Sequence, residues 1–498
     1  MRIDDLLYRQ KDNSKIALIQ GFHNITYEEW FYASEKLKTR IVEETDFNSK
    51  SVVLFLGNSI NYAIAYMGIL LSKQTVVPIG IQAKEREISA TLQYCEINMI
   101  ITDAEHYEVL KNSLKSYKYQ LKILLVDTLE AYVLNAKSRM NQGSNQENLD
   151  DVAIMLHTSG TLSDPKRVML THDNLISNVE SNIKCLDNSK EEVTLIALPM
   201  YFGYCNTSQF LTHVYLGAAM IIMDTIFYPQ IFFQLVQKYK VTNFTGVPTM
   251  LLMLLKYRYS DRYDISSLRY ICFGGGSMPV ESLKKLVTMY ETVGFVQTYG
   301  QTECSPRVTA LMPKDSLTKL GSVGVEIPDV NINIVDEEGN PVMAGEIGEI
   351  IVHGKNIMKG YYKKPDLTKD TIKNGWLYTG DLGYRDSEGY LYIKGRKKNV
   401  IISGGINIYP EEIEQIIRDF GNIEDVCIYG ESDFLLGEVP VAQIVAKNID
   451  IDSLKAYCKL NLSNYKIPVR FYIVDTIEKT YNGKIKRENI SDRGKKVE

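Results

Sequence analysis

The chain has 498 residues, which is too many for one compact core and fits two to four domains. With 45% hydrophobic and 23% charged residues, its composition excludes a disordered, collagen-like or disulfide-scaffold protein. The 56 Lys and Arg against 61 Asp and Glu give a net charge of −5, so the chain is not built around a nucleic-acid backbone.

Cysteines, histidines and apolar runs indicate the class of protein. The seven cysteines contain no C-x-x-C pair, which predicts reduced thiols in a cytoplasmic protein. The six histidines lack paired metal spacing, so we expect no structural zinc site. The first ten residues lack the apolar segment of an export signal. Runs 62–71 and 249–255 are far shorter than the ~20 residues of a spanning helix, so we expect core helices, with a peripheral membrane association left open.

Strand-like and helical stretches alternate along the first 300 residues. The first strands are expected at 51–56, 75–79, 99–102 and 122–126, with helices that include 58–72 and 85–94. After a polar loop at 141–150, strands are expected at 152–157, 193–198, 219–223, 243–246, 270–274 and 294–298. Near-continuous apolar strands that alternate with helices predict parallel sheets covered on both faces, as two α/β layers of one large unit.

The pattern changes after residue 321. Short strands with turn signals at 336–341 and 386–389 predict a small antiparallel β region. After residue 398, the expected elements are a helix near 410–420, strands near 426–429 and 439–446, and a helix near 452–462. This last part has the size and mixed pattern of a small α+β domain.

A hydroxyl-rich loop follows the strand 152–157 and precedes a helical pattern near residue 172. It runs through His157, Thr158, Ser159, Gly160, Thr161, Leu162, Ser163, Asp164, Pro165 and Lys166. Backbone N–H groups of small residues converge on an anion, and Lys166 adds a cation. The spacing differs from G-x-x-x-x-G-K-[ST], which excludes a P-loop NTPase. Taken alone, the stretch is equally an ordinary surface loop.

Three further patterns are each ambiguous alone. Glu303, in the run 299–303 at the end of a buried strand, suits Mg²⁺ bound together with substrate phosphates, or belongs to a capped helix start. Asp381, after a Gly in 376–381, is placed to accept both ribose hydroxyls, or stands in a tight turn. Lys484, on the Gly-containing turn 479–484, reaches a phosphate or is a solvated surface Lys.

Together, the residues, order and separations of the four patterns resemble the adenylate-forming superfamily. This family contains acyl- and aryl-CoA synthetases, peptide-synthetase adenylation domains and luciferases, and the chain looks most similar to the AMP-forming acyl-CoA ligases over about residues 25–487. The resemblance implies an α/β fold with a large N-terminal domain of two α/β subdomains and a small β-barrel, then a small mobile α+β C-terminal domain. Lys398 matches the family's hinge, which predicts domains at 1–397 and 398–498.

The resemblance also implies a two-step reaction. A carboxylate attacks the α-phosphate of ATP in the presence of Mg²⁺, which gives an acyl-adenylate and pyrophosphate. The thiol of coenzyme A, or of a carrier-protein phosphopantetheine, then displaces AMP. Positioned cations and N–H donors must neutralise the repulsion between the carboxylate and the triphosphate. Two alternatives stay open: an adenylation enzyme that loads an acyl or peptidyl carrier protein, and a catalytically silent ATP-binding homologue.

The family's functional residues carry over onto matching positions. For the β- and γ-phosphates, the resemblance implies Thr158, Ser159, Gly160, Thr161 and Lys166. For the adenine, ribose and acyl group, it implies Gly274, Gly275, Gly276, Tyr299, Gly300, Asp381 and Arg396. Thr302 contacts the α-phosphate, Glu303 binds Mg²⁺, and Lys484 bridges the carboxylate and the α-phosphate. Gly404 and Gly405 line the thiol tunnel after the C-terminal domain swings.

The sequence departs from the family in the phosphate loop, where Leu162, Ser163 and Arg167 replace a Thr and two Gly. Losing two glycines stiffens the loop, and losing a hydroxyl removes a phosphate ligand; Arg167 either compensates as a cation or obstructs. No long insertion follows Glu303 before residue 345. That absence favours a complete ligase over an enzyme restricted in the thiol step.

The predicted acid pocket consists of Phe202, Gly203, Tyr204 and Arg307. The segment 199–206 lacks the Asp with which amino-acid-activating members bind the α-ammonium, and an unpartnered buried ammonium is costly, so an amino acid is disfavoured. Phe202 replaces the His of many CoA ligases as an aromatic gate. The neutral neighbours favour an apolar acid, fatty or aromatic, as in fatty acid metabolism. Arg307 either pairs with a second carboxylate or polar tail or lies at the surface.

Overall fold

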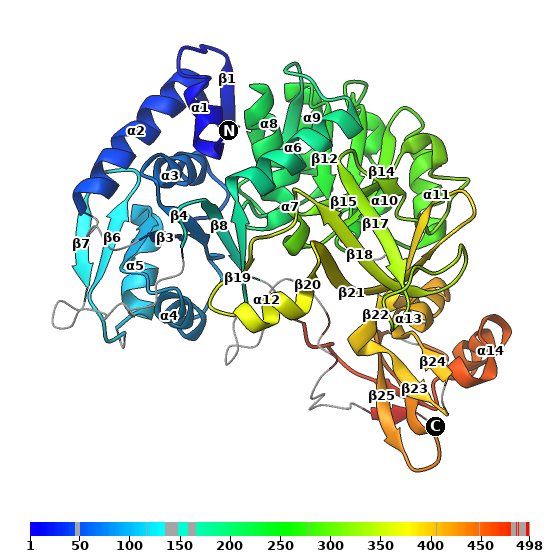
Figure 1. Cartoon of the computed structure of the whole chain (residues 1–498). Helices are drawn as coiled ribbons and strands as arrows, with labels where there is room; N and C mark the ends of the chain where they lie inside the picture. The colour runs from blue at the N-terminus through cyan, green and yellow to red at the C-terminus, as the bar shows by residue number, and fades with distance from the viewer. Residues whose placement is uncertain are drawn as a thin grey trace.

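The computed structural model describes residues 1–44, 50–115, 117–134, 148–157, 166–276, 278–404, 406–447, 449–479, 485, 487 and 495–497. Figure 1 shows a blue-to-cyan α/β part beside a green α/β part, with yellow strands below them and an orange-to-red lobe at the C-terminal end. Within the described residues, no helix is both long and apolar enough to cross a membrane.

The first α/β part contains a mixed sheet with the strand order β19–β9–β8–β4–β3–β5–β6–β7. Its strands are β3 (Ser51–Leu54), β4 (Thr75–Pro78), β5 (Met99–Thr102), β6 (Leu121–Leu125), β7 (Ala131–Leu134), β8 (Val152–His157), β9 (Arg167–Thr171) and β19 (Gly360–Tyr361). Its helices are α3 (Ile60–Leu71), α4 (Glu85–Tyr94) and α5 (Ala104–Ser113). The central pairs β8–β4, β4–β3, β3–β5 and β5–β6 are parallel, as their apolar runs predicted.

The second α/β part contains a sheet in the order β16–β15–β14–β13–β12–β10–β11–β1–β2. Beyond β1 and β2, its strands are β10 (Val193–Ile196), β11 (Ala219–Ile222), β12 (Asn243–Gly246), β13 (Tyr270–Phe273), β14 (Gly294–Gly300), β15 (Arg307–Leu311) and β16 (Val325–Glu326). The helices are α6 (His172–Leu186), α7 (Gly203–Cys205), π-helical η1 (Asn206–Leu211), α8 (Thr212–Leu216), α9 (Pro229–Tyr239), α10 (Pro248–Lys256) and α11 (Val280–Met289). Short 3-10 turns occupy η2 (Ser260–Arg262), η3 (Thr302–Cys304) and η4 (Pro313–Asp315).

Every strand predicted between residues 51 and 298 overlaps an observed strand. No element is predicted before residue 51, yet the chain begins with α1 (Ile3–Tyr8), β1 (Ile16–Gln20), β2 (His23–Thr26) and α2 (Tyr27–Glu44). Strand β1 adds to the second sheet beside β11, about 200 residues later in the chain. Of the predicted loop 141–150, residues 141–147 lie outside the described part.

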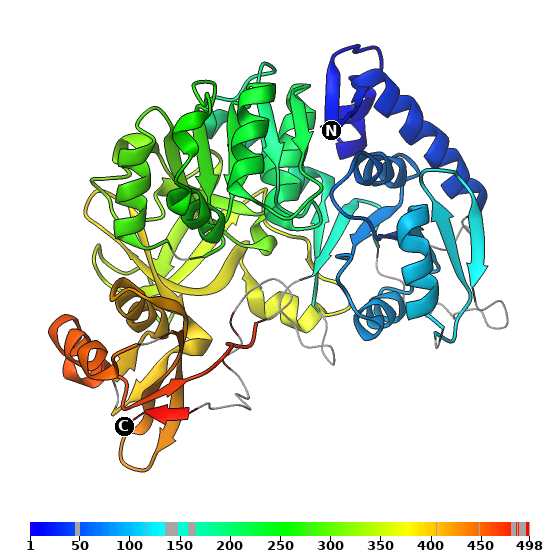
Figure 2. The same ribbon diagram turned by 180° about the vertical axis from the view of Figure 1, so that it is seen from behind.

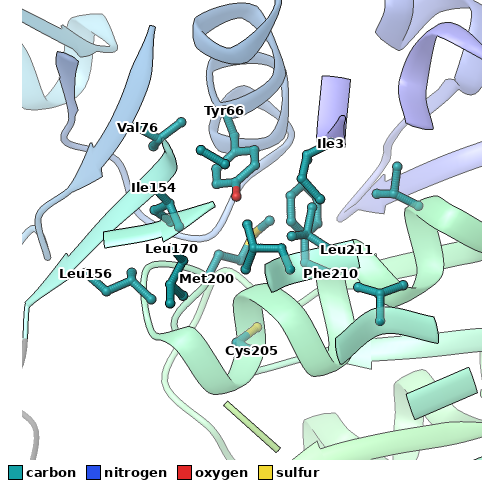
Figure 3. Close-up of a cluster of buried hydrophobic side chains, with 14 of the residues drawn as sticks. Ile3, Tyr66, Val76, Ile154, Leu156, Leu170, Met200, Cys205, Phe210 and Leu211 are labelled. Carbon is teal, nitrogen blue, oxygen red and sulfur yellow. The ribbon is translucent and has the colours of Figure 1, made fainter. Parts of the chain in front are cut away.

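One hydrophobic core joins the two α/β parts, as predicted for a single large unit. Figure 3 shows side chains from both parts in contact, with Tyr66 of α3 and Ile154 of β8 on one side and Met200 and Phe210 on the other. These side chains are fully buried. The α7–η1 segment is therefore packed firmly between the two sheets.

The third part is an antiparallel sheet in the order β17–β18–β21–β20, with β22 paired to β21. Its strands are β17 (Val330–Val335), β18 (Gly348–Gly354), β20 (Ile372–Lys373), β21 (Trp376–Arg385) and β22 (Leu391–Arg396), and helix α12 (Pro365–Thr371) precedes β20. The small β-barrel expected here is a half-barrel, because the described strands form an open sheet. Register places Asp381 of β21 directly opposite Arg396 of β22.

The C-terminal lobe has its own sheet, in the order β24–β23–β26–β27–β28 with β25 paired to β26. Its elements are β23 (Ile401–Ser403), β24 (Ile406–Ile408), α13 (Pro410–Asp419), β25 (Ile423–Asp433), β26 (Gly437–Ala446), α14 (Ile451–Asn461), η6 (Asn464–Lys466), β27 (Arg470–Ile473) and β28 (Lys495–Val497). The turn η5 (Lys397–Asn399) connects it to β22. Figure 2 shows this lobe, orange to red, below the yellow strands. The predicted α+β pattern is confirmed.

Candidate active site

A buried carboxylate lies where β14, β21 and β22 meet. Asp381 is only 4% exposed. Its Oδ2 accepts hydrogen bonds from Tyr299 Oη at 2.6 Å and Gln301 Nε2 at 2.5 Å, and its Oδ1 lies 2.6 Å from Arg396 Nε. Burial and the nearby carboxylate raise the pKa of Tyr299 well above its ordinary value, so the phenol stays protonated and donates. Three of the predicted nucleotide-binding residues are thus brought together.

The turn before Asp381 fixes this carboxylate in place. Thr379 Oγ1 accepts from the Asp381 backbone N–H at 3.0 Å, and the Thr379 carbonyl accepts from Gln301 Nε2 at 3.0 Å and Arg396 Nη1 at 3.1 Å. Gly380 has φ +69°, a left-handed conformation that glycine adopts without a Cβ penalty. The side chain of Gln301 therefore supports both ends of the turn, a role that the sequence patterns did not reveal.

Glu303 lies close to a cation and a phenol. Tyr361 Oη donates to Glu303 Oε1 at 2.9 Å, and Lys166 Nζ is 5.9 Å from the centre of the Tyr361 ring. The Met358 N–H donates to the Glu303 carbonyl at 2.9 Å, which anchors the short η3 turn. Within the described residues, Glu303 Oε2 has no recorded hydrogen bond. A carboxylate oxygen left available in this way suits a hard divalent cation that also takes oxygen ligands from phosphates.

Tyr361 was missed by the sequence analysis, because it belongs to a different strand and lies 58 residues after Glu303. No motif marks it, and only the pairing of β19 with β9 brings it beside Lys166. Burial and Glu303 raise its pKa above the ordinary value of a tyrosine, which keeps its hydroxyl a donor.

The glycine run after β13 passes very close to β14. A Cβ at Gly274 would lie 2.6 Å from both the carbonyl oxygen and Oγ1 of Thr298. Gly275 has φ +79°, and a Cβ at Gly276 would meet only the Pro248 ring, at 3.8 Å. Gly275 and Gly276 are exposed. The run thus offers a bare backbone surface, which is what the predicted contact with adenine requires.

The start of α7 lies between two residues of the β14–η3 segment. Tyr204 Oη is 2.8 Å from Thr298 Oγ1. A Cβ at Gly203 would lie 3.1 Å from Leu156 Cδ1 and 3.9 Å from Thr302 Cγ2. Gly203 therefore lies beside the predicted α-phosphate contact, and Tyr204 extends from there toward β14.

Arg307 is deeply buried. It is 1% exposed and stands at the start of β15, paired in register with Gly300 of β14. The alternative of a surface arginine is therefore wrong. No local pattern indicates this burial, because Arg307 follows a polar stretch and precedes an apolar strand whose depth depends on the sheet around it.

Arg167, one of the departures from the family pattern, contacts helix α4. Its Nη2 donates to Thr91 Oγ1 of α4 at 2.5 Å, and the residue is buried. Together with burial, which is the larger cause, its charge lowers the pKa of His157 to about 4, so His157 is neutral at pH 7.

Three predicted residues lie at the margins of the site. Phe202 is half-buried, with its ring 4.5 Å from that of Tyr201. The Gly404 N–H, at φ +57°, donates to the Leu436 carbonyl at 2.7 Å in the C-terminal lobe. Lys398 lies in η5, between the last strand of the third sheet and the first strand of the fourth.

Several predicted residues lie outside the described part of the chain, so the structure says nothing of their positions. They are Thr158, Ser159, Gly160, Thr161, Leu162, Ser163, Gly405 and Lys484.

Comparisons with known proteins agree with this arrangement. Residues 8–362 match the family model of the AMP-binding enzyme, and residues 412–484 match that of the AMP-binding enzyme C-terminal domain. The chain is 30% identical to a 2-succinylbenzoate–CoA ligase of Bacillus licheniformis, over 96% of each chain. It is 32% identical to a long-chain-fatty-acid–CoA ligase of Bacillus subtilis, over 88% of this chain and 84% of the relative.

Solved structures of O-succinylbenzoate CoA synthetase (MenE) from Bacillus subtilis have the same fold. The complex with the acyl-adenylate intermediate OSB-AMP matches with a TM-score of 0.87 and 28% identity, over 98% of this chain and 99% of that one. The complex with ATP and magnesium ion matches with a TM-score of 0.86 and 27% identity, over the same shares. The carboxylate cluster, the glycine run and these similarities lead to one conclusion: the chain belongs to the AMP-binding enzyme family.

Proposed function

We propose that this chain is an AMP-forming acid–thiol ligase, which activates a carboxylic acid with ATP and transfers the acyl group to coenzyme A. Its relatives include CoA ligases for an aromatic and a fatty acid, and a related structure holds an acyl-adenylate. The chain covers nearly the whole length of the first of these relatives. The seven cysteines are all free thiols, which supports a cytoplasmic location.

The observation that carries the proposal is the set of groups around Asp381. A carboxylate has about four acceptor positions, and Tyr299, Gln301 and Arg396 occupy three. The cluster lies at the edge of the sheet where the bare backbone of 274–276 follows the neighbouring strand β13. A carboxylate fixed beside such a backbone surface suits a nucleoside, with its ribose hydroxyls on Asp381 and its base against the glycines.

The triphosphate would lie toward Lys166 and Glu303. Lys166 supplies a positive charge, and Glu303 has an oxygen available for a cation. Mg²⁺ bound there together with phosphate oxygens neutralises charge on the polyphosphate. Thr302 contacts the α-phosphate beside Gly203, and Lys484 brings the attacking carboxylate to the same phosphorus.

We further propose two domains, 1–397 for binding ATP and the acid and 398–498 for the mobile part. Sheet membership supports this boundary, because β22 ends at Arg396 in the third sheet and β23 begins at Ile401 in the fourth. In the second step, Gly404 and Gly405 line the path of the pantetheine arm.

The test separates the two half-reactions. Pyrophosphate release is measured over a panel of fatty, aryl and dicarboxylic acids, with hydroxylamine to trap the acyl-adenylate. Lys484→Ala should reduce adenylation by about 100-fold or more, while thioester formation from supplied acyl-adenylate stays near the wild-type rate. Lys479→Ala is the matched control, because Lys479 Nζ is already paired with Asp425 at 2.5 Å. Equal loss in both half-reactions contradicts the role of Lys484.

The thiol acceptor is tested by offering free coenzyme A beside a phosphopantetheinylated carrier protein. Efficient turnover with free coenzyme A supports the ligase and removes the carrier-loading alternative. ATP binding without any hydroxamate, across the whole acid panel, overturns the proposed activity.

A further inference from the structure

The Arg307 guanidinium has no anionic partner among the described residues. Its Nε, Nη1 and Nη2 are inaccessible to solvent, and none of them makes a hydrogen bond of normal geometry there. The polar groups that it approaches are the neutral Tyr204 hydroxyl and the neutral Cys272 thiol. The Arg307 carbonyl accepts from Asn178 Nδ2 at 2.8 Å, which holds the start of the strand in place.

The groups around the guanidinium are neutral. The charge of Arg307 acts on Tyr204, Tyr270, Cys185 and Cys272, which come from α7, β13 and α6. Burial raises the pKa of each of these phenols and thiols, so none carries a negative charge at neutral pH. The part of the chain that the structure describes thus supplies no counter-ion here.

The carboxylate whose charge reaches the same region is already used. Glu192 acts on Tyr270, but it is paired with Arg269 and accepts from Asn243 Nδ2 at 3.0 Å. An arginine does not lose its proton in a protein, so Arg307 remains a buried cation. A buried charge without a partner is among the costliest groups that a fold can contain.

A second unpartnered polar atom lies on the neighbouring helix face. Asn182 Oδ1 is buried without a hydrogen bond in the described structure. In α6, Asn182 lies one turn from Asn178, which contacts the Arg307 backbone, and shares a helix face with Cys185, on which the Arg307 charge acts. The polar region at Arg307 thus includes more than one group that lacks a partner.

The contacts of Tyr204 and Gly203 connect Arg307 to the part of the site where we propose that the acid is activated. Tyr204 contacts Thr298 and lies within reach of the Arg307 charge, whereas its neighbour Gly203 lies beside Thr302. The proposed acid-binding site therefore extends from Thr302, along Gly203 and Tyr204, to Arg307. An acid activated at Thr302 points its other end toward the guanidinium.

We propose that Arg307 binds a second anionic group on the acid, so the substrate is a dicarboxylic acid or an acid with a comparable anionic end. This inference rests on the proposed ligase activity and names its substrate class. The tail of the acid reaches Arg307 past the half-buried Tyr204 ring, and its carboxylate takes the forked donors of the guanidinium. The rest of the pocket stays apolar, as the sequence predicted.

The test uses matched acids and the full-length enzyme. ATP–pyrophosphate exchange is measured with succinate, adipate and suberate, each beside the monocarboxylic acid of the same length and the monomethyl ester of the diacid. We expect kcat/KM for the best diacid to exceed that of its monomethyl ester by about 100-fold, because the ester leaves a buried cation unpaired.

Arg307→Met should remove this preference. Activity on the best diacid should fall by about 100-fold, while activity on its monomethyl ester holds or rises. Arg307→Lys should restore part of the preference, since an ammonium keeps the charge but not the fork. Arg262→Met is the control, because Arg262 is exposed on η2 and its loss removes one positive charge elsewhere.

The outcomes distinguish this inference from the proposed activity. Exchange with monocarboxylic acids that equals or exceeds exchange with every matched diacid overturns the role of Arg307 and leaves the ligase activity intact. A diacid preference that survives in Arg307→Met also overturns it. No exchange with any acid, in an enzyme that is folded by circular dichroism, overturns both.

Discussion

Two buried charged groups belong to the candidate site, Asp381 and Arg307, and their surroundings differ. Asp381 has a phenol, an amide and a guanidinium around it, all within 2.6 Å. Arg307 is equally buried, but the polar groups that its side chain approaches, such as Tyr204 and Cys272, are neutral. The first group has most of its acceptor positions filled before any ligand binds, whereas the second still needs an anion to balance its charge.

The difference fits the two tasks that we propose. Every turnover needs the same nucleotide, so the cluster at Asp381 is prebuilt and rigid, which lowers the cost of ordering it on binding. The acid varies between members of the family, so its end of the site is where one side chain selects the substrate. Donors left unpaired in the free protein discriminate strongly against an acid that cannot bind them.

The largest loss of stability is expected at the β14–β15 strand pair, which connects the Asp381 cluster to Arg307. A Cβ at Gly300 would lie 1.7 Å from the Pro306 carbonyl oxygen, a backbone atom that cannot move aside without shifting β15. Gly300→Ala should cost more than about 4 kcal/mol of unfolding free energy, or prevent folding. Gly276→Ala is the control, because its Cβ would meet only Pro248 at an ordinary 3.8 Å. Equal denaturant midpoints for the two variants would contradict the prediction.

Low pH should destabilise the protein around His213, behind the proposed binding site for the carboxylic acid. His213 Nδ1 donates to the Gln209 carbonyl of η1 at 2.6 Å, and its Nε2 accepts from Asn243 Nδ2 at 3.1 Å. Burial lowers the pKa of His213 to about 4. Below pH 6.5 the unfolded chain binds the proton first, so stability falls as the pH drops from 6.5 toward 4, by about 3 kcal/mol from this residue.

Urea unfolding at pH 7, 5.5 and 4.5 measures this dependence. Buried His157 and His172, whose pKa values are also lowered to about 4, add to the same slope. His213→Gln should flatten the slope without abolishing it. An unchanged slope in that variant would show that His213 titrates alike in both states.

Removing the charge at the nucleotide end should destabilise the free protein. Asp381→Asn leaves Arg396 without its carboxylate, and we expect a loss of about 2 kcal/mol and a KM for ATP raised by about tenfold or more. Asp264→Asn is the control, since Asp264 pairs with Lys240 on the surface, where little change is expected. Chemical denaturation and ATP titration measure both effects.

Removing the charge of Arg307 should change the stability of the ligand-free protein in the opposite direction. Arg307→Met replaces a buried cation that has no anionic partner among the described residues with an apolar side chain of similar length, and the ligand-free protein should gain about 1 kcal/mol. Arg396→Met, which deprives Asp381 of its partner, should lose stability instead. A destabilised Arg307→Met would mean that the guanidinium is already satisfied in the free protein.

The sequence predicted the regular parts of the fold well, because those parts follow local patterns. Strand β8 is a continuous apolar run and is buried along most of its length. Helix α6 begins at a Thr171 cap whose Oγ1 accepts from the Asn174 N–H at 3.1 Å. The hairpin β1–β2 was missed, since its neighbour in the sheet, β11, is distant in the chain.

The sequence patterns identified individual residues of the site, but not the contacts between them. Asp381 and Tyr299 were identified from their patterns, yet the 82 residues between them hide the hydrogen bond that joins them. Tyr361 carries no local signal at all. The burial of Arg307 depends on the sheet and helices assembled around it, which no pattern in residues 304–307 encodes.

The pairing of Gly300 with Arg307 has a consequence for how such an enzyme diversifies. The nucleotide contacts that we propose come from β14, β21 and β22, whereas Arg307 begins β15. If Arg307 acts as we propose, a single codon change at position 307 alters which acids are accepted while the proposed ATP site is inherited intact.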